Sequence, residues 1–269
     1  MGQEGNLKNI WVPLSGAIAQ QRQVEAIANN VANANTPGFK KDQVVFEEYM
    51  TEIHNPQSDI NVPVGDISPA DFYQTNGAEN SKVKISGTYT DFEQGQHSPT
   101  GNPLDISLQG TGFLEVNTPY GVRFTRQGIL SMAQDGTLIT NQGHQVLSSG
   151  TTPPESRLIK VPNEKIKIVD NGEIYAGGQK VSALSVVEFI DSHALKKEGA
   201  GLYINENPEN QKPNQKTVVK QGFLEDSNVN AVSEMSSLIK ANRQFESIQR
   251  AIKAYDNISG RAVNDIAKF

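Results

Sequence analysis

Residues that transfer protons or bind metals in other proteins are scattered along this chain rather than grouped. The four histidines stand apart, at His54, His97, His144 and His193, and the sequence contains no cysteine. Zinc sites draw their ligands from closely spaced His and Cys pairs, and a nucleophilic thiolate requires a cysteine. The sequence therefore predicts no metal site, and it excludes disulfides and thiol chemistry.

Two stretches carry fragments of catalytic patterns. Asp191, Ser192 and His193 are the residue types of a hydrolytic triad, but residues adjacent in sequence do not point at one another, so a loop after a strand is the simpler interpretation. The stretch QGTGFLEV, residues 109–116, begins like a glycine-rich phosphate loop. It lacks a third glycine and leads into a strand pattern, so it indicates a tight turn.

Two pairs of adjacent acids have the residue types of a general acid and a general base. They are Glu47–Glu48 and Glu225–Asp226. Solvated surface charge explains both pairs, and a position near a helix N-terminus also explains the second. These stretches therefore indicate no catalytic residues and no cofactor site.

Composition narrows the classes of partner. The chain has 269 residues, a formal net charge of −6 and a hydrophobic fraction of 36%. This acidic balance is unsuited to nucleic acid or an anionic membrane. The N-terminal stretch lacks a basic region followed by an unbroken apolar run, so we expect no cleavable signal peptide, and no run of about 18 apolar residues predicts a membrane span.

Residues between Leu14 and Asn33 have the periodicity of a helix with one narrow apolar stripe. Pro13 suits the first turn of this helix, and Pro37 with Gly38 ends it. The apolar positions follow steps of three and four residues, with Gln21 filling one step: Ile10, Leu14, Ala17, Val24, Ala28 and Val31.

A longer helix of the same kind is predicted from about Asn230 to the last residue, with Gly260 as a weak point inside it. Its stripe consists of Leu238, Ala241, Phe245, Ile248, Ile252, Tyr255, Ser259, Ala262, Ile266 and Phe269. We predict an assembly interface on the two stripes and call its residues the terminal seams. They are Leu14, Ala17, Val24, Ala28, Val31, Leu238, Ala241, Phe245, Ile248, Ile252 and Tyr255.

The middle of the chain, from about Lys82 to Phe223, reads as short strands such as LDISLQ and LSVVEFI separated by glycine turns. We expect a mainly β fold with one all-β middle domain and terminal helices that pair as a coiled coil. The expected divisions are a helical segment at 1–36, an extended connector at 37–81, the all-β domain at 82–225 and a helical segment at 226–269 that packs with the first.

The terminal seams admit two interpretations. An amphipathic helix is usually the outer layer of a globule, with its stripe on the core. Here the stripes are narrow and lie at the chain ends, outside the β-domain, which favours burial against other molecules. We hypothesise that both ends are poorly ordered in the monomer and become ordered on self-association.

Asparagines gather where the first helix ends, at Asn29, Asn30, Asn33 and Asn35. An amide donates and accepts hydrogen bonds, so these side chains suit helix capping or contacts between neighbouring copies. A helix C-cap without any role in assembly is the alternative for Asn35. Pro37 and Gly38 then predict a type II turn, because Gly at its third position accepts a positive φ.

The stretch IANNVANANTPGFKKDQVVFE, residues 27–47, resembles the N-terminal signature of the bacterial flagellar rod and hook proteins. Residues 90–116, 124–147 and 221–256 resemble the remaining blocks of that family, so the resemblance covers both ends and most of the middle. The matching signature positions are Asn29, Asn30, Ala32, Asn33, Asn35, Thr36, Gly38, Phe39 and Lys40.

This resemblance implies a structural subunit of the flagellar basal-body rod, without catalytic activity, that assembles with itself and with other rod subunits. It also implies export by the flagellar type III apparatus and a place in the periplasm-spanning rod, where terminal helices form the inner coiled-coil core. The stretch TGNPLDISLQGTGF looks most like the proximal rod (FlgF) type, and the distal rod (FlgG) type is the alternative. A secreted β-domain enzyme or glycan binder with helical oligomerisation ends is the rival of another class.

Overall fold

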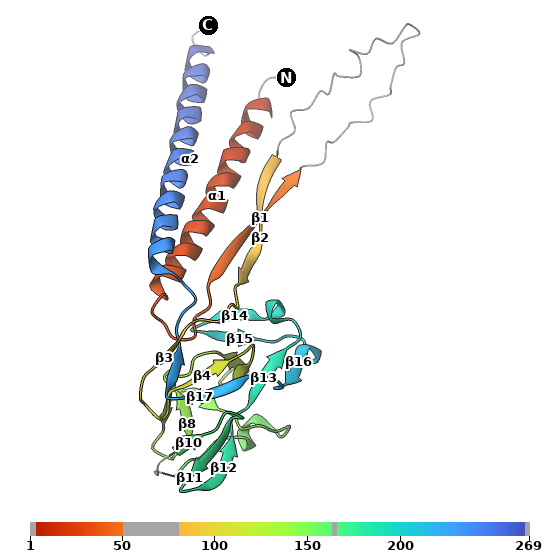
Figure 1. The fold of residues 1–269 in the computed structure, drawn as a ribbon. Coiled ribbons are helices and arrows are strands. Elements are labelled where there is room, and N and C mark those ends of the chain that lie inside the picture. The colour runs from red at the N-terminus through yellow and green to blue at the C-terminus, as the bar shows by residue number, and fades with distance from the viewer. Residues whose placement is uncertain (1–3, 51–80, 163–165, 267–269) are drawn as a thin grey trace, which may run out of the picture. The chain divides into compact units, whose positions relative to one another are not determined.

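The computed structural model describes residues 4–50, 81–162 and 166–266 (Figure 1). Two long helices, α1 (Glu4–Ala32) and α2 (Ala231–Ile266), flank a chain that is otherwise built from strands. The prediction of a mainly β fold with a helix at each end is confirmed. The chain divides into two compact units, one from residues 1–26, 44–88 and 236–269, the other from residues 27–43 and 89–235.

The first unit contains most of both helices and a two-stranded sheet of β1 (Asp42–Met50) and β2 (Ser81–Thr90). Within it, the buried Gln20 side chain of α1 donates a hydrogen bond to the Ala241 carbonyl of α2 over 3.3 Å. Strand β1 occupies part of the segment expected to be an extended connector. Residues 51–80, the rest of that segment, lie outside the described residues.

The helix boundaries differ from the sequence-based ones mainly at the start of α1. This helix begins at Glu4, so Pro13 lies inside it, and the prediction that Pro13 occupies the first turn is wrong. Proline is favoured in a first turn because it lacks an N–H, but a long helix can tolerate one in its interior at a cost of about 3 kcal/mol. Helix α2 starts one residue after the predicted Asn230, whose side chain accepts from the Ser233 N–H and caps it.

Strands β3 to β18 lie in the second unit, which also contains residues 27–43, and we call these strands, their loops and the flanking residues 91–96 and 226–230 the β-body. The strands are β3 (His97–Pro99), β4 (Ile106–Gln109), β5 (Phe113–Thr118), β6 (Gly121–Thr125), β7 (Leu130–Met132), β8 (Leu138–Thr140), β9 (Gln145–Val146), β10 (Ile166–Ile168), β11 (Glu173–Ala176), β12 (Gln179–Ala183), β13 (Val186–Phe189), β14 (Lys196–Gly199), β15 (Leu202–Ile204), β16 (Gln211–Pro213), β17 (Val218–Gln221) and β18 (Phe223–Glu225).

The largest sheet of the β-body follows the order β14-β15-β6-β5-β9-β8-β7, and β13 joins it by pairing with β5 and β16. Smaller antiparallel sheets pair β10, β11 and β12, β17 with β4, and β18 with β3. The last two pairings matter for the site described below, because they tie the strands that precede α2 to strands from the early part of the β-body.

Two apolar clusters fill the β-body. One contains fully buried aliphatic residues such as Leu114, Val116 and Ile174, and the other is largely aromatic and includes Phe113 and Tyr203. Burying apolar area of this kind contributes about 25 cal/mol per Å², so the β-body has its own source of stability.

Turns in the β-body use the chemistry expected from the sequence. The glycines at 136, 143, 172 and 178 all have positive φ. Residues 110–112 connect β4 to β5, which confirms the tight turn in QGTGFLEV. Asp191 caps a short 3-10 turn at Ser192–Ala194 after β13, as the loop interpretation predicted. Neither described helix is long and apolar enough to cross a membrane.

Candidate functional site

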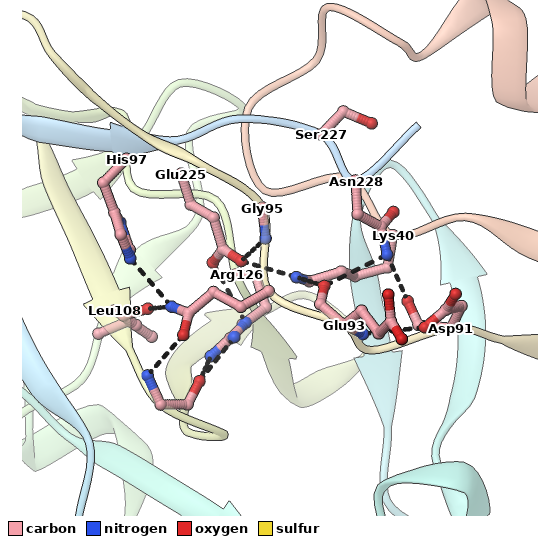
Figure 2. A network of polar contacts seen from close by, with 12 residues as sticks. Lys40, Asp91, Glu93, Gly95, His97, Leu108, Arg126, Glu225, Ser227 and Asn228 are labelled. Atoms are coloured by element: carbon pink, nitrogen blue, oxygen red, sulfur yellow. Dashed lines mark hydrogen bonds and ion pairs between the residues drawn. The ribbon is translucent and has the colours of Figure 1, made fainter. Parts of the chain in front are cut away.

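Residues 27–43, which contain the signature positions and which we call the signature segment, lie against the β-body within the second unit. The contacts come from residues 27–43 on one side and from residues 89–97, Arg126 and residues 225–234 on the other. We call this set of contacts the junction (Figure 2). It joins four parts of the chain that are separated in the sequence.

The turn at Pro37 and Gly38 brings the chain from α1 onto the β-body. The Phe39 N–H donates to the Thr36 carbonyl over 3.2 Å, and Gly38 has a φ of 71°, as the predicted type II turn requires. The Gly38 N–H also donates to the Glu225 carbonyl over 2.7 Å. A Cβ atom at Gly38 would lie 2.5 Å from the Arg126 carbonyl oxygen, so both the turn and the close approach require glycine.

Three charged side chains meet behind this turn (Figure 2). The Lys40 Nζ atom lies 2.6 Å from Glu225 Oε1 and donates to the Glu93 carbonyl at 2.6 Å. Arg126 Nε lies 3.4 Å from Glu225 Oε2. The side chains of Lys40, Glu225 and Arg126 are 0%, 1% and 2% exposed. A buried charge must be paired and hydrogen-bonded to be tolerated, so this cluster fixes its members in place.

Arg126 is held by the β-body itself. Its Nη1 and Nη2 atoms donate to the Gly110 carbonyl at 2.8 and 2.7 Å, and Nη1 also donates to the Gly112 carbonyl. The guanidinium carbon lies 5.4 Å from the centre of the Phe113 ring. These acceptors belong to the turn between β4 and β5, so the turn whose residues begin like a phosphate loop binds an arginine of the same chain.

The residues after Lys40 connect the junction to both helices. Asn30, the buried asparagine near the end of α1, exchanges two hydrogen bonds with the Asp42 backbone, at 2.8 and 2.9 Å. Lys41 Nζ lies 2.6 Å from Glu234 Oε1 in the first turn of α2. The Lys41 N–H donates to Asn228 Oδ1 at 2.8 Å. Two consecutive residues therefore contact the end of one helix and the start of the other.

Further side chains cover the edges of the junction. Lys197 donates to the Lys40 carbonyl at 3.0 Å, pairs with Asp42 at 2.8 Å and lies 4.0 Å from the centre of the Phe39 ring. On another edge, His97 contacts the Gln94 amide at 3.1 Å. The second ring nitrogen of His97 is buried without a hydrogen-bond partner.

Burial changes the proton affinities of the junction. Burial lowers the pKa of Lys40 below its ordinary value of 10.5, although the nearby Glu225 carboxylate opposes this shift. Burial also lowers the pKa values of Arg126 and His97, again against the opposing effect of Glu225. The common cause is that a dry environment disfavours the charged form of each base.

The structure distributes the signature residues between two tasks. Asn30, Gly38, Phe39 and Lys40 are buried in the junction. Asn33 caps the end of α1 by donating to the Asn29 carbonyl at 2.9 Å, and its Oδ1 accepts from Thr36. Asn29, Ala32 and Asn35 are exposed. The asparagine with the clearest internal role is thus Asn30, which the sequence did not distinguish from the others.

The terminal seams are only partly covered. Ala17 and Ala241 are buried. Leu14, Ala28 and Tyr255 are exposed. The remaining seam residues are half-buried: Val24, Val31, Leu238, Phe245, Ile248 and Ile252.

Sequence reasoning missed the charged half of the junction. Of the two interpretations given for Glu225 and Asp226, solvated surface charge is wrong for Glu225. This carboxylate is buried, because Lys40 and Arg126 neutralise it although no local pattern links them to it. Its neighbour Asp226 accepts a hydrogen bond from Ser98. Arg126 was not singled out either. The one signal that could have linked the two residues is the family resemblance. Lys40 lies in the signature and Glu225 in the last block that resembles the family, and their opposite charges make them a candidate ion pair.

A groove elsewhere on the β-body is a second candidate for a binding site. It is lined by residues 149–152, by the end of β12 and by residues 211–218. The charged residues Glu115 and Arg157 in its wall pair with each other at 2.7 Å, and Ser185 donates to Glu115 at 2.6 Å. These groups neutralise each other within the protein. Among the described residues, no group of three or more His, Asp or Glu side chains is placed to bind a metal ion.

Comparison with known proteins matches three family models. Residues 12–40 match the flagella basal body rod protein family, residues 107–176 the D1 domain of the flagellar hook protein FlgE/F/G family, and residues 220–265 the C-terminal region of the flagellar basal body rod FlgEFG proteins. The first and third matches together contain Lys40 and Glu225, which meet in the junction.

Individual relatives match over nearly their whole length. The chain is 30% identical to the flagellar basal-body rod protein FlgF of Mesorhizobium japonicum, over 96% of this chain and 97% of the relative. It is 31% identical to the flagellar basal-body rod protein FlgG of Bacillus subtilis, over 96% and 98%, and 31% identical to the flagellar hook-basal body complex protein FlhO of the same species, over 98% and 100%. With helices at both ends, a β-body between them and this agreement along the sequence, the chain belongs to the family of flagellar basal-body rod proteins, which are structural proteins and not enzymes.

Proposed function

We propose that this protein is a subunit of the proximal rod that assembles through the terminal seams of α1 and α2. Its partners are further copies and other rod subunits, and no cofactor takes part. In this proposal the two helices pair as a coiled coil in the core of the rod, and the β-body lies outside that core. The flagellar type III apparatus exports the chain.

The observation that carries this proposal is the exposure of apolar side chains along both helices. Leu14 and Tyr255 in the terminal seams are 37% and 50% exposed, and Ile18 and Ile239, each next to a seam residue, are 52% and 55% exposed. A helix of this length gains most of its stability from burying an apolar face, and burial of each such side chain is worth about 1.5 to 3 kcal/mol. Neighbouring subunits are the natural source of that burial in a rod.

Assignment to the proximal rather than the distal rod is part of the proposal. It draws on the stretch TGNPLDISLQGTGF and on the single β-body, and relatives of both types match at nearly equal identity. Complementation separates the two. Expression of this chain should restore motility to cells that lack their FlgF-type subunit and not to cells that lack the FlgG-type subunit, and the reverse result would assign it to the distal rod.

Seam substitutions test the proposed mode of assembly. Phe245→Asp and Ile252→Asp place a carboxylate on the half-buried stripe of α2, where a neighbouring helix would have to desolvate it. We expect both variants to lose incorporation into the basal body and motility. The measurement is the amount of this subunit in purified basal bodies, together with swimming in soft agar.

Gln244→Asp is the matched control, because Gln244 lies on the same helix and is exposed. This variant should assemble normally, and the circular dichroism of all three variants should show a folded β-body. Normal basal bodies from Phe245→Asp and Ile252→Asp would reject the seams as the interface.

The rival, a secreted β-domain enzyme or glycan binder, is less well supported. The groove near Glu115 is a place where such an activity could be sited, and two of its charged groups, Glu115 and Arg157, pair with each other. A variant that removes this pair, Glu115→Gln, would lose function under the rival hypothesis even where the protein assembles. Under our proposal it alters only the stability of the β-body.

A further inference from the structure

Three of the buried charged side chains of the junction meet in one cluster, in which cations outnumber carboxylates. Two cations, Lys40 and Arg126, face the single carboxylate of Glu225, and each of the three side chains is almost completely buried. Removing the charge of Lys40 leaves one cation and one carboxylate, which balance. Removing the charge of Glu225 leaves two buried cations without a counter-charge, which is far less favourable.

Arg126 and Glu225 form one half of the arrangement without help from the signature segment. Arg126 is held by the carbonyl groups of Gly110 and Gly112, and Glu225 Oε1 accepts from the Gly95 N–H at 3.1 Å. Each of these groups belongs to the β-body. We call Arg126, Glu225 and Gly95 the receiving half of the junction.

The signature segment supplies the other half. Lys40 reaches Glu225 with its ammonium group, and the Gly38 N–H binds the Glu225 backbone carbonyl. Immediately afterwards, Asp42 binds Asn30 in α1 and Lys41 binds Glu234 in α2. The two residues that follow Lys40 therefore contact one helix each: Lys41 contacts α2 and Asp42 contacts α1.

We infer that Glu225 is the hub of a positioning joint, in which the receiving half binds Lys40 and thereby fixes the last turn of α1 and the first turn of α2 on one β-body. The inference concerns the isolated chain and does not depend on the assembly mode proposed above.

Hydrogen exchange of the full-length chain, resolved by residue, tests the joint. The reporters are the amides of Gly38, Asp42 and Glu234, which bond to Glu225, Asn30 and Asn230 and lie in two segments far apart in the sequence. We expect Glu225→Gln to raise the exchange rates of all three by about tenfold or more, because an uncompensated buried cation opens the junction as a unit. A rise limited to the amides nearest Glu225, such as Gly95, would overturn the inference.

Glu115→Gln is the matched control. Glu115 is also buried and also paired with an arginine, Arg157, but it lies elsewhere in the β-body. The exchange rates of the three reporters should stay within about twofold of wild type in this variant after correction for any change in global stability. A rise equal to that in Glu225→Gln would mean that the reporters follow overall stability rather than a joint.

Lys40→Met keeps the inference testable even where Glu225→Gln does not fold. This variant removes one cation and leaves Arg126 and Glu225 balanced, so the Gly95 amide should exchange at the wild-type rate. The Gly38 and Asp42 amides should exchange faster, by less than about tenfold, because the backbone bonds of the segment remain. Loss of protection at Gly95 to the same degree as in Gly38 would show that Lys40 belongs to the receiving half, contrary to the inference.

Discussion

The terminal helices and the β-body bury their apolar side chains to very different extents. In the β-body, Leu114, Val116 and Ile174 are completely buried among residues of the same chain. Along α1 and α2, Ile18, Ile239 and Tyr255 keep about half of their surface exposed. The apolar core of the β-body is thus complete within one molecule, whereas apolar side chains along the helices stay partly exposed.

The junction is stabilised in a different way from the apolar core of the β-body. Several of its buried side chains are charged groups or amides with specific partners: Lys40 pairs with Glu225, and Asn30 binds the Asp42 backbone. Apolar contacts tolerate small shifts, whereas a buried ion pair is lost when its geometry changes.

Hydrogen exchange across the whole chain sharpens this comparison most strongly. In the isolated chain, amides of α1 before Ala26 and of α2 after Ser236 should exchange about 100-fold or more faster than those of β5, because little buried surface protects the helices. Amides of residues 38–42 should be as slow as β5. Residue-resolved exchange at neutral pH is the measurement.

Two outcomes would break the comparison. Helices that exchange as slowly as β5 would mean that one molecule already stabilises them, and the apolar stripes would then need no neighbours. Fast exchange at residues 38–42 would mean that the junction opens with the helices and belongs to the less stable region.

The next largest expected effects are changes in the free energy of unfolding caused by substitutions at two glycines. Gly38→Ala should lower the free energy of unfolding of the second unit by about 2 to 3 kcal/mol, because of the positive φ and the contact with the Arg126 carbonyl. Gly16→Ala in α1 should instead stabilise the helix by about 0.5 to 1 kcal/mol, since a Cβ atom there meets nothing within 4 Å. Urea unfolding followed by circular dichroism measures both, and a neutral Gly38→Ala would show that the turn has room for a side chain.

Local patterns were sufficient for most of the fold. The strands and their glycine turns follow from alternation and turn chemistry, and α2 follows from its unbroken steps of three and four residues. The start of α1 did not follow, because Pro13 reads as a first-turn residue in any sequence-based rule. The signature also predicted the turn at Gly38 from residue types alone.

The site was predictable only where a neighbour in sequence determines it. Asn33 caps α1 through Asn29, four residues away, and the sequence indicates such a role. Lys40 and Glu225 are separated by 185 residues. Nothing in the composition around Glu225 distinguishes a buried carboxylate from a solvated one, because the cations that neutralise it come from two other segments. Tertiary packing decided the burial of this residue.

The smallest predicted effect is a dependence of stability on alkaline pH. Burial lowers the pKa of Lys40 in the folded chain below its ordinary value of 10.5, so between these two pKa values the unfolded chain binds more protons than the folded one. The free energy of unfolding should therefore rise with pH in this window, by at most about 1.4 kcal/mol per pH unit. Below the folded pKa of Lys40 this contribution should be constant.

Tyr203 acts in the opposite direction, because burial raises the pKa of its hydroxyl and favours unfolding once free tyrosine ionises, above about pH 10. The informative quantity is therefore the difference between wild type and Lys40→Met, which share Tyr203. Urea unfolding between pH 7 and 10 should give a wild-type stability that gains on the variant as pH rises. A constant difference would mean that Lys40 keeps its proton throughout, held by Glu225, and that the junction contains two permanent cations.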